Sequence, residues 1–328
     1  MSTTDVSPDP DDTSTGQEST SEVETEPSAR PGLDACRPGD IESAGRVERS
    51  DLVETSGLAA SRRHEGVLWA HNDSGSAAGI YAVGLDGEDL GFFALQDDGA
   101  PVDAVDVEDV AIVDDRLYLA DIGDNGAGRA AVTVYVLAEP EPGVDGQAEV
   151  LQIIQVRYPD GPTDAEALVV DPASAELLIL SKDLDAPTAP TRLYAAPLPD
   201  QTTPLVEVEP TLVGQLDVAA ITATSASISI GGLLFPGSVT GADLAPAGDL
   251  LVLRTYGSAW LFARADGQSL AEALAGEPCE GGAAGEGQGE AIAFLPPSAD
   301  GLGDGAVRYA TIGEGANRAV NVVVIGGG

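Results

Sequence analysis

The stretch Glu108–Asn125 reads EDVAIVDDRLYLADIGDN and contains two short apolar runs separated by an acidic turn. The first run opens directly after Glu108 and Asp109, and the second, Arg116–Ala120, ends at Asp121. Short runs that are rich in β-branched residues and bounded by turn formers are typical of β-strands. Acidic residues therefore stand where one strand begins and where its neighbour ends.

This opening element recurs along the chain, and the second residues of its copies are at positions 57, 109, 167, 243 and 291, in steps of 52, 58, 76 and 48. A four-stranded propeller blade takes about 40–50 residues. The spacing predicts an all-β fold, a β-propeller of five blades, with six as the alternative if 205–230 forms a short one. The copies are Ser56–Ala59, Glu108–Ala111, Glu166–Val169, Ala242–Ala245 and Glu290–Ala293.

The ends of the chain fit this interpretation. The last repeat is too short for four strands, so we expect a strand within Ile41–Arg49 to complete it, because an open array would expose sheet edges. Residues 1–35 form an acidic tail rich in Ser, Thr and Pro, which we expect to be disordered, and 36–328 form the single propeller domain. An insertion is expected at Thr222–Gly237, and the best helix candidate is Ser269–Leu274.

Composition excludes several classes of function. The 328 residues include 15 Lys and Arg against 55 Asp and Glu, a net charge of −40, which disfavours nucleic-acid binding. Two His and two Cys exclude a three-histidine zinc site or a four-cysteine cluster, and no apolar run is long enough for a transmembrane helix. Whether the acidity reflects adaptation to salt stays open.

Cys36 and Cys279 are the only cysteines and have polar neighbours. Such flanks favour a disulfide between the start of the domain and a late loop, and two separate free thiols are the alternative.

The repeated acids are expected to meet at one end of the propeller, because the start of a strand and the end of its antiparallel neighbour lie at the same edge of a sheet. Converging carboxylates repel one another unless a cation lies among them, and Ca²⁺ suits an irregular set of oxygens. The alternative is that Asp73, Asp124 and Asn125 only form turns. The candidate metal ligands are Glu108, Asp109, Asp121, Asp124, Glu166 and Glu290.

Other polar residues are expected at the same end. Lys182, the only lysine, and Arg254, which the repeats place at the matching position, would hold an anionic ligand together with Asn72 and Asp183, or would only neutralise neighbouring acids. His71 with Asp73 is the candidate catalytic pair, with a structural hydrogen-bonding role as the alternative. The sequence has no Gly-x-Ser-x-Gly motif and no Walker loop.

Six motifs occurring in order resemble those of exported bacterial β-propeller proteins, mostly actinobacterial, which are described as WD-like or NHL-like and have no assigned activity. The resemblance implies a propeller in the extracellular space or cell envelope, although Met1 is followed by polar residues instead of a signal sequence. More remotely, the acid-lined channel is similar to that of calcium-dependent propeller phytases and gluconolactonase-type propellers, from which no catalytic residue carries over. The motifs are His71–Gly75, Glu108–Ala111, Asp121–Asn125, Asp164–Leu168, Thr240–Asp243 and Gly289–Ile292.

These observations lead to one main hypothesis and two alternatives. The main hypothesis is a monomeric extracytoplasmic propeller that binds a small molecule or a protein at an acidic, cation-bearing central face. The first alternative is a metal-dependent hydrolase of phosphate esters or lactones that uses the same residues. The second is a purely structural or protein-interaction propeller. The sequence does not decide whether the protein is an enzyme.

Overall fold

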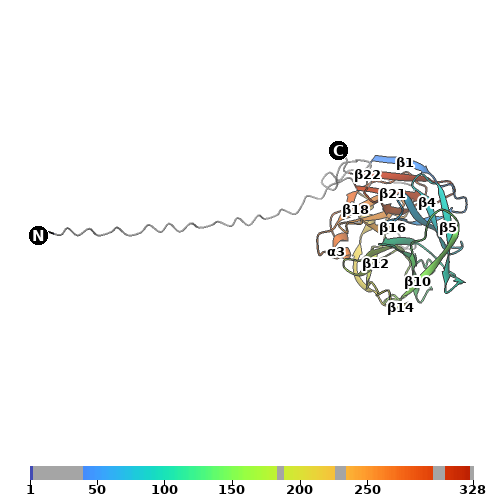
Figure 1. Cartoon of the computed structure of the whole chain (residues 1–328), viewed down its shortest axis with the longest axis horizontal. Helices are drawn as coiled ribbons and strands as arrows, with labels where there is room; N and C mark the ends of the chain where they lie inside the picture. Colours follow the sequence, from blue (N-terminus) through green and yellow to red (C-terminus); the bar gives the residue numbers. More distant parts are fainter. Residues whose placement is uncertain (3–39, 183–187, 226–233, 298–306, 326–328) are drawn as a thin grey trace.

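The computed structural model describes residues 1–2, 40–182, 188–225, 234–297 and 307–325. Its strands form four-stranded units of antiparallel neighbours, arranged around a common centre (Figure 1). The first unit contains β2 (Thr55–Ala60), β3 (Val67–Asn72), β4 (Gly79–Gly84) and β5 (Asp89–Asp97). The second contains β7 (Asp109–Val113), β8 (Arg116–Asp121), β9 (Val132–Ala138) and β10 (Gly146–Val156).

Three further units follow within the described residues. The third contains β11 (Ala165–Asp171), β12 (Glu176–Ser181), β13 (Thr191–Pro197) and β15 (Thr211–Leu216). The fourth contains β16 (Val239–Leu244), β17 (Leu250–Thr255), β18 (Ala259–Ala263) and β19 (Cys279–Glu280). The fifth contains β20 (Gly289–Phe294), β21 (Val307–Gly313), β22 (Ala319–Ile325) and β1 (Asp40–Arg46).

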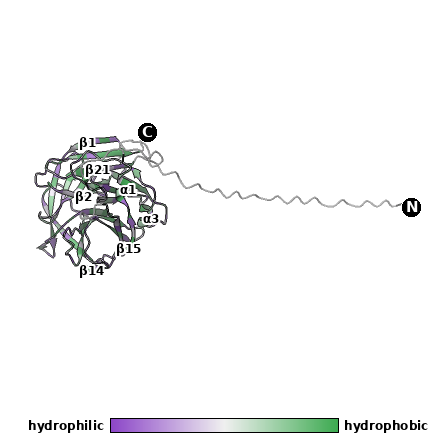
Figure 2. Ribbon diagram, turned by 180° about the vertical axis from the view of Figure 1, so that it is seen from behind, coloured by the Kyte–Doolittle hydropathy of each residue, from purple (hydrophilic) through white to green (hydrophobic). Residues whose placement is uncertain are grey.

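The inner strands β2, β7, β11, β16 and β20 contact one another in a closed ring, β20 lying against both β16 and β2. Hydrophobic clusters fill the spaces between neighbouring units. Trp69 and Leu119, for example, belong to the cluster between the first and second units, and Leu178 and Trp260 to that between the third and fourth. Figure 2 shows the hydrophobic colouring of many strand segments. This arrangement is a β-propeller, and the all-β propeller prediction is confirmed.

The N-terminal strand closes the ring. β1 pairs antiparallel with β22, the last strand of the described residues, so that Ile41 lies opposite Val323. Figure 1 shows β1 in blue beside β22 in red. The prediction that a strand from the start of the domain completes the last unit is therefore confirmed, and it leaves no open gap between the first and last units.

Segment 205–216 does not form an additional unit. β14 (Leu205–Val208) pairs parallel with β10, and β15 is the outer strand of the third unit. The second unit also pairs with the first, through parallel β5 and β10, and the short β6 (Ala100–Pro101) adds to β5. The alternative of a short blade at 205–230 is therefore not supported by the described part of that segment.

A β-bulge marks the start of most inner strands. The positions of these bulges show which residues of the repeats are equivalent. The pairing shifts around Glu166 in β11, around Thr240 in β16 and around Glu290 in β20, with a wider shift at Ser56–Gly57 in β2. Thr240 is thus the equivalent of the glutamates, and the prediction that put the fourth copy at Ala242 was two residues late. Alternation hides this error, because a shift of two residues keeps each side chain on the same face of the strand.

Two short helices lie in the described residues. α3 (Leu270–Leu274) is capped by Ser269, whose hydroxyl accepts a hydrogen bond from the Glu272 N–H, which confirms the predicted helix. α1 (Val218–Thr222) lies at the start of the expected insertion. In the part of the chain that the structure describes, neither helix is long and apolar enough to cross a membrane.

Two predictions fall outside the described residues. The acidic tail, 1–35, is described only at positions 1–2. Cys36 is also outside, while Cys279 is buried in β19. The predicted disulfide therefore stays a prediction.

Candidate functional site

Carboxyl groups gather where the inner strands begin, and we call this set the acidic mouth. The set combines glutamates at the start of three inner strands, aspartates two residues before two of those glutamates, and acids just beyond the ends of β3 and β21. The backbone N–H groups of Asp73, Lys182 and Glu314 make equivalent bonds to the residues before the inner strands, which fixes this register. The acidic mouth consists of Asp73, Asp106, Glu108, Asp164, Glu166, Glu290 and Glu314.

Five of these carboxyl groups form two groups of three that share Glu108. One group contains Asp73, Asp106 and Glu108, and the other contains Glu108, Asp164 and Glu166; within each, one oxygen of every residue lies within 4.8 Å of the others. Glu108 and Glu166 are buried, whereas the three aspartates are partly exposed. Two oxygens on opposite sides of one Ca²⁺ lie about 5 Å apart, twice the usual ligand distance, so each group has the dimensions of a cation site.

Burial and mutual repulsion hold protons on these groups. Burial, together with the nearby Asp73 carboxylate, raises the pKa of Asp106 to about 7. Burial, followed by the charges of Glu166, Asp73 and Asp106, raises the pKa of Glu108 well above its usual range. Protons are needed here because several carboxylates in one buried site cannot all stay ionised without a positive charge among them.

Lys182 provides one positive charge in the acidic mouth. Its ammonium group is buried, pairs with Glu166 Oε1, and lies 5.4 Å from the centre of the Tyr256 ring. Burial opposes the charge of Lys182, but the Glu166 carboxylate more than compensates and raises the pKa of the lysine. The second oxygen of Glu166, Oε2, is buried without a hydrogen-bond partner. One lysine therefore leaves this carboxylate only half satisfied.

Glu290 and Glu314 form a separate carboxyl pair in the acidic mouth. Their side chains hydrogen-bond to each other, and burial with the charges of Glu166 and Glu314 raises the pKa of Glu290 to about 9. The pair therefore shares a proton near neutral pH. Neither residue belongs to the two groups of three found among the described residues.

The backbone around Glu108 is shaped to leave room for its carboxylate. The Ser56 hydroxyl lies 3.0 Å from the Glu108 carbonyl oxygen and 3.3 Å from Glu108 Oε2. A Cβ added at Gly123 would overlap Glu108 Oε1 and would lie 2.5 Å from Asp106 Oδ2. Glycine at position 123 thus keeps open the space at the first group.

Three predicted metal ligands instead hold the backbone. Asp109 Oδ1 accepts the N–H of Val110, and its Oδ2 accepts the N–H groups of Leu168 and Ala242, at 2.9 and 3.3 Å. Asp109 thereby ties together the inner strands β7, β11 and β16. Alternation along the strand explains the difference from Glu108, because consecutive side chains point to opposite faces.

Asp121 and Asp124 are likewise engaged. Asp121 accepts the N–H groups of Val105 and Asp106 and forms an ion pair with Arg129 at 2.7 Å. Asp124 accepts the N–H groups of Gly128 and Arg129, which closes the loop after β8. Neither aspartate belongs to the two groups of three described above. The turn-forming alternative describes Asp124, whereas Asp121 holds the segment before β7.

Of the predicted ligand-binding residues, Lys182 lies in the acidic mouth, whereas Arg254 and Asn72 make contacts that hold the fold. Arg254 is fully buried and pairs with Glu286 at 2.5 Å, and by register Tyr256, not Arg254, is the equivalent of Lys182. The prediction that Arg254 matches Lys182 was wrong, because the repeat alignment in the fourth unit was displaced by two residues. Asn72 uses its amide to hold the N–H groups of Val53 and Glu54. Asp183 lies outside the described residues.

His71 is enclosed between the first two units. The residue is 1% exposed, its Nδ1 lies 3.0 Å from the Asn72 carbonyl oxygen, and a Cβ at Gly57 would overlap its Nε2. Burial lowers the pKa of His71 to about 4, so the ring is neutral at pH 7. His71 lies in neither group of three, while its predicted partner Asp73 lies in the first.

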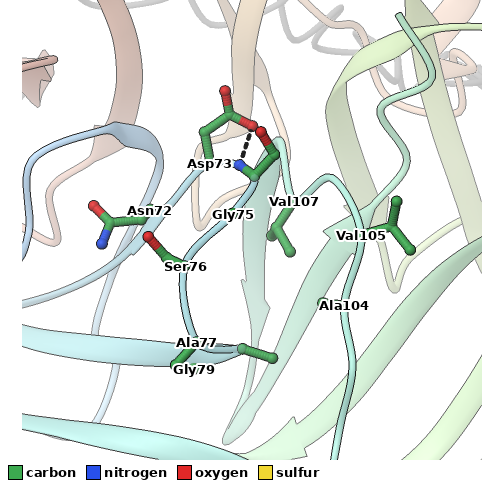
Figure 3. A pocket seen from close by; sticks show the side chains of 11 residues that line it. Asn72, Asp73, Gly75, Ser76, Ala77, Gly79, Ala104, Val105 and Val107 are labelled. Carbon is green, nitrogen blue, oxygen red and sulfur yellow. Dashed lines mark hydrogen bonds between the residues drawn. The ribbon is translucent and has the colours of Figure 1, made fainter. Parts of the chain in front are cut away.

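A small pocket adjoins the acidic mouth at Asp73 (Figure 3). It is lined by the loop 72–79 and by Ala104, Val105 and Val107, and its volume is about 10 Å³. That space holds about one water molecule. A ligand larger than water would therefore have to approach the partly exposed aspartates of the acidic mouth from solvent.

Sequence reasoning did not count three members of the acidic mouth, Asp106, Asp164 and Glu314, among the candidate ligands. The first two stand two residues before a repeated glutamate, in the pattern Asp-x-Glu. That repeated spacing was a usable signal, since residues two apart in an extended segment share a face.

The sequence matches no family model. It also matches no curated protein. Among solved structures, one similar chain comes from the crystal structure of a nidogen/laminin complex, with a TM-score of 0.39 and 13% sequence identity over 81% of this chain and 77% of that chain. This likeness is too weak to indicate a function.

Proposed function

We propose that this protein binds divalent cations, Ca²⁺ in the first place, in the acidic mouth, and that the bound cation holds a small-molecule or protein ligand at this end of the propeller. The observation that carries the proposal is the pair of three-carboxylate groups around Glu108, with Glu166 Oε2 buried and unpartnered. A cation would supply the missing partner and would relieve the repulsion that otherwise requires protons.

The donor atoms favour a hard cation such as Ca²⁺ over zinc and copper. Both groups offer only carboxylate oxygens, and the imidazole of His71 is not among them. Zn²⁺ and copper prefer nitrogen and sulfur ligands, whereas Ca²⁺ takes six to eight oxygens in irregular geometry. Three carboxylates leave coordination positions for water or for oxygens of a ligand, and the partly exposed aspartates mark the side from which it would come.

Calcium titration of the full chain tests the proposal. The protein is freed of metal with EDTA and titrated calorimetrically with CaCl₂, alongside Glu108→Gln, Glu166→Gln and the matched surface control Glu65→Gln. We expect binding by the wild type and by the control, and at least a tenfold loss of affinity in the two variants of the acidic mouth. Absence of binding by the wild type would remove the proposal and would leave the structural or protein-interaction alternative.

A metal-dependent hydrolase is the second candidate, favoured by one specific observation. A cation in the first group would keep coordination positions open beside the partly exposed Asp73 and Asp106, where it would activate a bound water. His71 is poorly placed to accept a proton from that water, because its Nε2 faces Gly57 inside the fold. The test is hydrolysis of a phosphate monoester and of a lactone with CaCl₂ or EDTA: calcium-dependent turnover that Asp106→Asn abolishes would establish an enzyme, and no turnover would leave the binding function.

We also propose an extracellular or cell-envelope location. Extracellular calcium modules bind with dissociation constants of about 10⁻⁴–10⁻³ M, which fits sites that keep several positions open. Fractionation of the source cells, with detection by antibody, distinguishes this location from the cytoplasm.

A further inference from the structure

We infer that the acidic mouth holds two divalent cations that share Glu108 as a common ligand. This inference rests on the proposed cation-binding function and adds the number of ions and the residue that joins them. It starts from the division of five carboxyl groups into two groups of three, with only Glu108 in both.

The division itself argues against one central ion. The ligand oxygens of a single Ca²⁺ lie within about 5 Å of one another, since each is about 2.4 Å from the ion. Among the described residues, the oxygens of Asp73 and Asp106 meet this condition with Glu108, and those of Asp164 and Glu166 meet it with Glu108, but the five do not form one group. A carboxylate has two oxygens and can bind one ion through each, so Glu108 is suited to joining two sites.

The charges of the residues agree with two ions. The five carboxyl groups carry five negative charges when ionised, and Lys182 pairs with one of them. Two divalent cations would compensate the other four, whereas a single one would leave two negative charges in a site where Glu108 and Glu166 are buried. Glu290 and Glu314 belong to neither group of three and are not counted in this balance.

The second group provides evidence beyond the clustering of acids. Glu166 is 1% exposed, its Oε1 is engaged by Lys182, and its Oε2 is buried with no hydrogen-bond partner. A buried carboxylate oxygen without a partner is costly, and a cation is a partner that the described protein groups do not supply. Asp164 is held in place at the same time, because its Oδ1 accepts the Asp124 N–H at 2.7 Å.

The test is the number of Ca²⁺ ions bound per chain, measured by equilibrium dialysis with elemental analysis and by calorimetry. Asp106→Asn changes only the first group, Asp164→Asn only the second, and Glu108→Gln both. We expect two ions in the wild type, one in each aspartate variant, and none bound with comparable affinity in Glu108→Gln. Asparagine keeps the acceptor oxygen at position 164, and thermal melting in EDTA shows whether each variant is folded.

The outcomes separate this inference from the proposed function. One ion in the wild type, lost in Asp106→Asn, in Asp164→Asn or in both, would overturn the two-ion inference and keep the cation-binding function. No ion in the wild type would overturn both. Two ions of which neither depends on Glu108 would overturn the shared ligand.

Discussion

Glu108 and Asp109 are neighbours in the sequence, both are buried, and they lie in regions of opposite character. Glu108 is in the acidic mouth, where it faces other carboxyl groups and its pKa is raised by burial and by their charges. Asp109 lies among the inner strands, where three backbone N–H groups from β7, β11 and β16 bond to it. The comparison teaches that burial of an acid does not identify a site, whereas the other carboxyl groups that face it do.

The largest effect is expected from removing the bracing acid. Asp109→Ala leaves three buried N–H groups without an acceptor, at a cost of about 1–3 kcal/mol for each unsatisfied group. We expect the free energy of unfolding in urea to fall by about 3 kcal/mol or more, against less than about 0.5 kcal/mol for the exposed control Asp103→Ala. Equal stability of the two variants would show that Asp109 does not brace the ring.

Replacing Glu108 should remove the stabilisation by calcium without lowering the stability of the calcium-free protein. At a calcium concentration 100-fold above the dissociation constant, a bound ion stabilises the wild type by about 2.7 kcal/mol. Thermal melting of Glu108→Gln should show no such gain, while its melting temperature in EDTA should equal that of the wild type, because glutamine is neutral like the protonated Glu108. A variant that is less stable than the wild type in EDTA would mean that Glu108 also braces the fold.

Glu290, another acid of the acidic mouth, should make the free energy of unfolding depend on pH. The pKa of this acid rises from 4.5 to about 9 on folding, so the folded state holds a proton that the unfolded state has released. The contribution of the protonated Glu290 to the free energy of unfolding is fully present below pH 4.5 and is lost as the pH rises through about 9. In EDTA we expect the wild type to lose roughly 1.4 kcal/mol per pH unit, relative to Glu290→Gln, between pH 6.5 and 8.5. Parallel pH profiles would contradict the raised pKa.

The smallest effect is expected from filling the space beside Glu108. The Cβ in Gly123→Ala would displace the carboxylates of Glu108 and Asp106, and we expect about a tenfold weaker calcium affinity, or about 1.4 kcal/mol. Gly126→Ala is the matched control, since a Cβ there meets no atom within 4 Å. Calorimetry of both variants checks this, and equal affinities would show that the space is not part of the cation site.

The sequence carried enough information for the architecture and for part of the site. Strand length, turn residues and the repeat spacing predicted the propeller, because each unit repeats the same local pattern. Glu108 and Glu166 could be recognised for the same reason. Arg254 and the fourth copy, Ala242, were misplaced because a shift of two residues keeps every side chain on the same face of its strand, so the alternating pattern does not reveal it.

By itself, then, the sequence determined that the chain forms a propeller with acids at the ends of its inner strands. Only the tertiary structure decided which acids are bonded by backbone N–H groups and which face one another. Asp109, Asp121 and Asp124 find donors on other strands and loops, whereas Glu108 and Glu166 meet carboxylates from a neighbouring unit. The physical reason is that these partners are brought together by closure of the ring, which no local pattern in the sequence describes.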